Sequence, residues 1–110
     1  MAIHIDSITK LQEYLQGVLG RADHHAKNVE GVALALLGAV IWKSNEIKVR
    51  EYAGRPANMI WFKVGGKEYL MKYNHPSEQI ELIDGATNVV LHNFDNLTTY
   101  TNILYIFNSL

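Results

Sequence analysis

The chain has 110 residues, of which 48% are hydrophobic and none is cysteine. This length and composition predict a single globular domain over residues 1–110. Without cysteine the chain forms no disulfide and no thiolate metal site, which favours a reducing compartment such as the cytoplasm. Ten basic and eleven acidic residues give a formal net charge of −1. Such a balance lacks the strong positive field of a typical nucleic-acid-binding protein.

Two features bear on membranes and targeting. The stretch from Met1 to Asp6 has no basic region followed by an apolar segment, so it does not predict a signal peptide. The longest apolar run, Gly31 to Trp42, is too short to cross a bilayer and is interpreted as a buried helix. We therefore expect a cytoplasmic protein that does not contact a membrane.

Two helices are predicted in the first part of the chain. Apolar residues from Ile8 to Leu19 recur at helical spacing, and Gly20 predicts a turn after them. A second helix is expected from about Asp23 to Trp42. Its inner stripe consists of Ala22, His25, Val29, Val32, Leu36 and Val40. Four small residues widen this stripe and allow close approach of another element: Ala33, Ala35, Gly38 and Ala39.

From Ile47 onward the apolar residues alternate with a period of two, which predicts strands. A turn is expected over residues 54–57. Gly65-Gly66 predicts a two-residue hairpin turn, because glycine adopts positive φ angles at little steric cost. That turn pairs Phe62 with Tyr69, Ile60 with Met71, Trp61 with Leu70, Lys63 with Glu68 and Asn58 with Tyr73.

The register can be continued through two further four-residue loops, 74–77 and 84–87. The predicted core face then contains Ile60, Phe62, Tyr69, Met71, Ile80, Leu82, Val89 and Leu91. A last helix is expected to begin at Asn96 or Thr98 and to run through Phe107. The predicted fold class is α+β, with two N-terminal helices, a five-stranded antiparallel meander sheet and a C-terminal helix.

The opposite face of the predicted sheet is unusually apolar. It gathers Met59, Trp61, Leu70 and Val90. Because a solvated sheet face is normally more polar, this cluster predicts an interface, most simply that of a two-fold homodimer. The alternative is that the last helix covers this face.

A candidate pocket lies where the strand ending at Tyr73 meets its turn. Its predicted walls are Asn58, Tyr73, His75 and Glu78, closed by Arg21, His24 or His25. An imidazole would be the general base, because its pKa lies near neutrality. The alternative is structural, with residues 74–77 acting only as a turn and His25 as a hydrogen-bonded residue at the core edge.

Other kinds of site are disfavoured. Side chains of adjacent helical residues diverge by about 100°, so His24 and His25 do not readily share a metal, and we expect neither metal nor cofactor. The basic residues of the early strands are Lys48, Arg50, Arg55, Lys63, Lys67 and Lys72. Acidic residues interrupt them at Glu51, Glu68 and Glu81, which argues against a nucleic-acid interface.

Several segments resemble those of uncharacterised small bacterial proteins, some of them similar to products of mobile integron gene cassettes. These segments are Arg21-Ala22-Asp23-His24-His25-Ala26-x-Asn28-Val29, Gly38-Ala39-Val40-Ile41-Trp42, Asn58-x-x-Trp61, Tyr73-Asn74-His75 and Ile80-Glu81. The resemblance implies a bacterial protein and assigns no catalytic residue. We expect a homodimeric binding or interaction module with a small-molecule or protein ligand. The alternatives are a small hydrolase or lyase that uses His75 or His25 with a nearby carboxylate, and an immunity or antitoxin-like partner protein.

Overall fold

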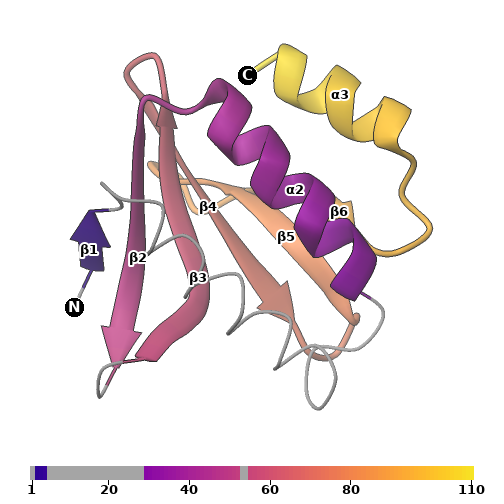
Figure 1. Cartoon of the computed structure of the whole chain (residues 1–110), viewed down its shortest axis with the longest axis horizontal. Helices are drawn as coiled ribbons and strands as arrows, with labels where there is room; N and C mark the ends of the chain where they lie inside the picture. Colours follow the sequence, from indigo (N-terminus) through magenta and orange to yellow (C-terminus); the bar gives the residue numbers. More distant parts are fainter. Residues whose placement is uncertain (1, 5–28, 53–54) are drawn as a thin grey trace.

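The computed structural model describes residues 2–4, 29–52 and 55–110. Its elements are β1 (Ala2–His4), α2 (Glu30–Lys43), β2 (Glu46–Tyr52), β3 (Arg55–Val64), β4 (Lys67–Asn74), β5 (Gln79–Asp84), β6 (Val90–Phe94) and α3 (Tyr100–Asn108). The strands form one antiparallel sheet in the order β1 to β6, and α2 and α3 lie side by side over one face of it (Figure 1). The α+β class is confirmed. The predicted five-stranded meander corresponds to β2–β6, and β1 adds a short strand at its edge. The first predicted helix lies outside the described residues.

The β3–β4 hairpin has the predicted register. Phe62 pairs with Tyr69 and Ile60 with Met71, while Trp61 pairs with Leu70 on the other face. Gly65 has a φ of 64°, which is the left-handed conformation expected of a tight hairpin turn. The Phe62 and Tyr69 rings stack at 5.5 Å between centroids.

The β4–β5 register differs from the prediction by two residues. Met71 pairs with Leu82 rather than with Ile80, and Tyr73 pairs with Ile80. The turn occupies residues 75–78, one residue later than predicted. Because side chains alternate with a period of two, this shift leaves every side chain on its predicted face.

The β5–β6 register was predicted wrongly. Leu82 pairs with His92 rather than with Val89, and a register irregularity lies between Leu82 and Ile83. The predicted core residues Val89 and Leu91 are exposed, and Phe94 is buried instead. The irregularity inside the ladder causes this reversal. Ile83 pairs with Val90 and Leu82 with His92, so Leu91 is an extra residue and the side chains after it change face.

The turn predicted over residues 54–57 was also placed wrongly. Arg55 already pairs with Tyr52 in the β2–β3 ladder, and Pro56 pairs with Glu51. A register shift between Val49 and Glu51 accompanies this pairing. Proline is tolerated near the start of a strand and beside such an irregularity, so it does not mark the end of the strand here.

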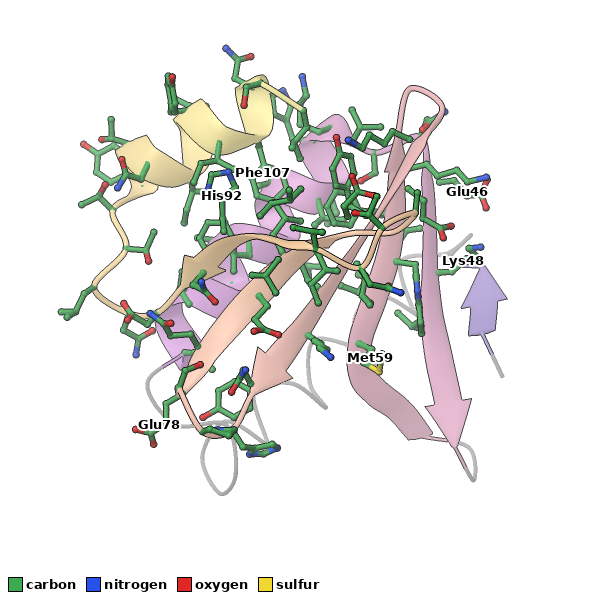
Figure 2. All side chains as sticks on the ribbon, turned by 180° about the vertical axis from the view of Figure 1, so that it is seen from behind. Glu46, Lys48, Met59, Glu78, His92 and Phe107 are labelled. Carbon is green, nitrogen blue, oxygen red and sulfur yellow. The ribbon has the colours of Figure 1, made fainter. Side chains whose placement is uncertain are left out.

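The core lies between the sheet and the two helices. Val29, Val32, Leu36 and Val40 are buried as predicted, together with Ile103 and Phe107 of α3. The Phe107 ring stacks on Phe62 with 6.0 Å between centroids, and Figure 2 shows Phe107 between α3 and the sheet. The alternative prediction, that the last helix covers the opposite face, is therefore wrong.

Helix α2 begins at Glu30, and residues 23–28 of the predicted helix lie outside the described residues. The N-terminal cap of α2 comes from a distant loop. Val29, the residue before the helix, makes no side-chain capping hydrogen bond. The Asn96 side-chain oxygen instead accepts hydrogen bonds from the backbone N–H groups of Gly31 and Val32, both at 3.1 Å. The first N–H groups of a helix lack partners within the helix, so Asn96 satisfies two of them and ties the β6–α3 loop to α2.

Replacing Asn96 with alanine should lower the free energy of unfolding by about 0.5–2 kcal/mol, the usual effect of losing such a cap. Urea denaturation at one fixed protein concentration measures the change. Asn108→Ala is the matched control, because Asn108 is exposed at the end of α3. Equal stability of the two variants would show that the Asn96 cap contributes nothing.

Candidate functional site

The end of the β4–β5 hairpin contains two residues of the predicted pocket in direct contact. The Tyr73 and His75 rings meet edge to face, with centroids 4.7 Å apart. Tyr73 is buried at the end of β4, whereas His75 is exposed in the following turn. The tyrosine ring thus orients the imidazole, as an aromatic pair of this geometry does.

The other residues of the predicted pocket are only partly brought together. Glu78 is exposed in the same turn as His75, at a positive φ of 55°, and Figure 2 shows it at this hairpin. Asn58 lies on β3. Arg21, His24 and His25 fall outside the described residues, so their closure of the pocket stays a prediction.

A polar contact next to this turn explains its shape. The Asn74 amide donates a hydrogen bond to Glu81 at 3.0 Å, and its side-chain oxygen accepts one from the Ser77 backbone N–H at 3.1 Å. Asparagine commonly closes a turn in this way. The structural alternative for residues 74–77 thus accounts for Asn74.

The predicted interface forms one row across the sheet. Trp61 pairs with Leu70, Leu70 with Ile83, and Ile83 with Val90. Leu70 and Ile83 are buried within the chain, Trp61 and Met59 are half-buried, and Val90 is exposed. Self-association through this row stays a prediction, and its central members offer little surface to a partner.

Several lysines of the early strands are paired with carboxylates. The Lys48 Nζ lies 3.3 Å from the Glu68 Oε2, and the Lys63 Nζ lies 3.8 Å from the Glu46 Oε2. Figure 2 shows Glu46 and Lys48 on β2. These partly exposed pairs neutralise each other locally and contribute little to stability individually.

A third ion pair joins the start of β4 to the end of β5, where the connection to β6 begins. The Asp84 Oδ2 lies 3.1 Å from the Lys67 Nζ. The Asp84 Oδ1 accepts hydrogen bonds from the backbone N–H groups of Ala86 and Thr87. The hydrogen bond from Lys67, followed by those from Ala86 and Thr87, holds the pKa of Asp84 below its ordinary value. The same hydrogen bond raises the pKa of Lys67. This cluster holds the backbone that connects β5 to β6.

The lowered pKa of Asp84 predicts a loss of stability in acid. A carboxyl group whose pKa is lower in the folded state stabilises fully above its unfolded value, about 3.9, and loses that contribution as the pH falls through the folded value. Asp84→Asn keeps the side-chain oxygen that accepts from Ala86 and Thr87. The wild type should therefore be more stable than Asp84→Asn at pH 6, and the difference should shrink below pH about 4. Urea midpoints measured from pH 6 to pH 2.5 test this, and a constant difference would contradict it.

The helices present an apolar surface that sequence reasoning missed. The α2 residues exposed on the side away from the sheet are Gly31, Leu34, Ala35, Gly38, Ile41 and Trp42. None of them is charged. On α3, Tyr100 and Leu104 are exposed as well. We call these eight residues the helical face.

A groove of about 320 Å³ opens between the start of α2 and the start of α3. Gly31, Val32 and Ala35 line it from α2, and Asn96, Tyr100 and Ile103 line it from the loop and α3. It adjoins the helical face at the end where α2 begins. Its lining combines apolar side chains with the polar side chains of Asn96, Thr98 and Tyr100, a combination that small binding sites also have.

The described residues contain no cluster of three histidine, aspartate or glutamate side chains that could hold a metal ion. None of the helices in this described part of the chain has the length and apolar character needed to cross a membrane.

The fold and surface define a class of small α+β proteins, with one antiparallel sheet covered on one face by two helices. Residues 11–104 match the family described as integron cassette protein VCH_CASS1 chain, so the chain belongs to that family. This agrees with the resemblance drawn from the sequence. A comparison with curated proteins found no match.

Proposed function

We propose that the protein is a homodimeric binding or interaction module of the cytoplasm, and that it self-associates through the helical face. One observation carries this proposal. Leu34, Ile41 and Trp42 of α2 are 51–53% exposed, and no charged residue lies among them. The two charged residues of α2, Glu30 and Lys43, are its first and last.

A solvent-facing helix surface normally has charged and polar residues opposite its buried stripe. A helix that is apolar on all sides is normally covered on all sides. Helix α2 has this apolar composition, yet the sheet and α3 leave one side of it exposed. A second protein surface would complete its burial.

The exposed area approaches the lower end of the range for a stable two-fold interface. The helical face has five large side chains, Leu34, Ile41, Trp42, Tyr100 and Leu104, which are 51–83% exposed. They offer roughly 500–600 Å² together, and the backbone around the small residues adds to this; a standard interface buries about 800 Å² per partner. None of the eight residues is charged, and the charged residues of α2, Glu30 and Lys43, lie at opposite ends of the helix, so two identical copies do not bring a cluster of like charges together.

Size-exclusion chromatography with light scattering on three variants tests the proposed surface. Leu34→Glu places a charge in the helical face and should raise the dimer dissociation constant by about tenfold or more. Tyr105→Glu is the control, since Tyr105 is 76% exposed on α3 outside this face. It should remain as dimeric as the wild type.

Trp61→Glu, on the opposite sheet face, separates the two candidate interfaces. If the dimer survives Leu34→Glu but is lost in Trp61→Glu, the helical face is not the interface. That result would instead support the interface predicted on the opposite face of the sheet. Circular dichroism confirms that each variant is folded. A wild type that is monomeric at every concentration would overturn the homodimer.

A further inference from the structure

The helical face has an exposed tryptophan, Trp42, at one end and the groove at the other. Trp42 lies in the last turn of α2 and is 53% exposed. The groove is lined by Gly31 and Ala35 in the first turns of the same helix. At a rise of about 1.5 Å per residue, Trp42 and Gly31 are about 16 Å apart along the helix axis.

For each Trp42 to reach the groove of the other copy, the two α2 helices must run antiparallel. A two-fold axis perpendicular to α2, near its middle, places the two helices antiparallel and brings the last turn of each against the first turn of the other. Each Trp42 then faces the groove of the other copy. A parallel arrangement would instead set Trp42 against Trp42 and leave both grooves empty.

We infer that two copies of the chain pair antiparallel along α2, with the Trp42 indole of each inserted into the groove of the other. This inference rests on the proposed homodimer and specifies how it is built. A buried tryptophan at a two-fold interface is a typical dominant contributor to binding, because it removes a large apolar area from water with few rotatable bonds.

The groove has the chemistry that an indole requires. Val32 and Ile103 contribute apolar side chains to its lining, and Thr98 and Tyr100 contribute side chains that carry a hydroxyl group. The indole N–H is a donor only, so it needs an acceptor when buried, and either hydroxyl can serve. Lys43 lies with its Nζ 5.1 Å from the centre of the Trp42 ring in the same chain. This contact is compatible with insertion, because a lysine can keep its charged end in water at the rim.

Gly38 lies on α2 between Trp42 and the groove residues, where the two helices would cross. A Cβ atom added at Gly38 would meet nothing within 4 Å in the same chain. Gly31, Ala35 and Gly38 have little or no side chain, which allows the backbones of two helices to approach closely. Gly38→Glu should therefore leave the fold intact and block pairing.

A double-mutant cycle on the dimer dissociation constant tests the insertion. Trp42→Ala and Tyr100→Ala should each weaken the dimer, Trp42→Ala by at least about tenfold. If the two side chains meet across the interface, the double variant should be weakened by clearly less than the product of the two single effects. Within one chain, Trp42 lies about 10 Å along the helix axis from Ala35, the groove residue nearest to it in sequence, so coupling inside one chain should be small.

The outcomes separate this inference from the proposed function. Suppose that Gly38→Glu abolishes the dimer but Trp42→Ala changes the dimer dissociation constant by less than threefold. The helical interface would then stand, and the insertion of Trp42 would be overturned. Independent effects of Trp42→Ala and Tyr100→Ala would also overturn it. A monomeric wild type would overturn both. Tyr105→Ala is the matched control, because it removes an exposed tyrosine from the other side of α3.

Discussion

Phe107→Ala should lower the free energy of unfolding by about 3–5 kcal/mol, the range for removing a large aromatic side chain from a core. Phe107 is 0% exposed and stacks on Phe62, which in turn stacks on Tyr69. Together with Ile103, it therefore joins α3 to the core over the sheet. Its loss leaves a cavity that this short helix can close only by moving.

Urea denaturation at a fixed protein concentration measures this effect, with Tyr105→Ala as the control on the same helix. Tyr105 is 76% exposed, so its loss should change stability by less than about 0.5 kcal/mol. Equal effects of the two substitutions would show that α3 is not held by Phe107.

Gly85→Ala should lower the free energy of unfolding by about 1–3 kcal/mol, because the added methyl group has no space. A Cβ atom at Gly85 would lie 2.7 Å from the backbone oxygen of Glu68. The Gly85 N–H donates a hydrogen bond to that same oxygen at 2.9 Å, so the two backbones cannot separate without losing it.

Gly66→Ala is the matched control, because a Cβ atom there meets nothing within 4 Å. Thermal unfolding followed by circular dichroism should show a lower midpoint for Gly85→Ala and little change for Gly66→Ala. The same midpoint for Gly85→Ala and the wild type would contradict the close approach of this loop to β4.

The part of the fold that could be predicted is the part whose geometry is set locally. Gly65-Gly66 permits one tight turn, and that turn fixes the β3–β4 register and the faces of Ile60, Phe62, Tyr69 and Met71. The β4–β5 loop was misplaced by one residue, yet the faces were preserved because the resulting shift is two.

The features that could not be predicted depend on contacts between distant residues. The β5–β6 connection is shaped by Asp84 with Lys67 and by Gly85 against Glu68. Neither contact follows from turn propensities. The first turn of α2 is capped by Asn96, more than sixty residues further along the chain. A local search for a capping residue cannot find it.

The candidate site was predicted only in part for a similar reason. Tyr73 and His75 do lie together, because they are neighbours on one hairpin. The helical face escaped prediction because α2 is apolar on all sides. Its hydrophobic pattern was read as that of a fully buried helix, and only the structure shows that Leu34, Ile41 and Trp42 are left uncovered.

The central claim is that this uncovered face pairs two copies of the chain. Equilibrium sedimentation of the unmodified protein over a range of concentrations tests it most directly. The mass should approach twice the 12.5 kDa of one chain as concentration rises, and Gly38→Glu should remain at the mass of one chain. A wild-type mass of 12.5 kDa at every concentration up to about 1 mM would contradict the claim.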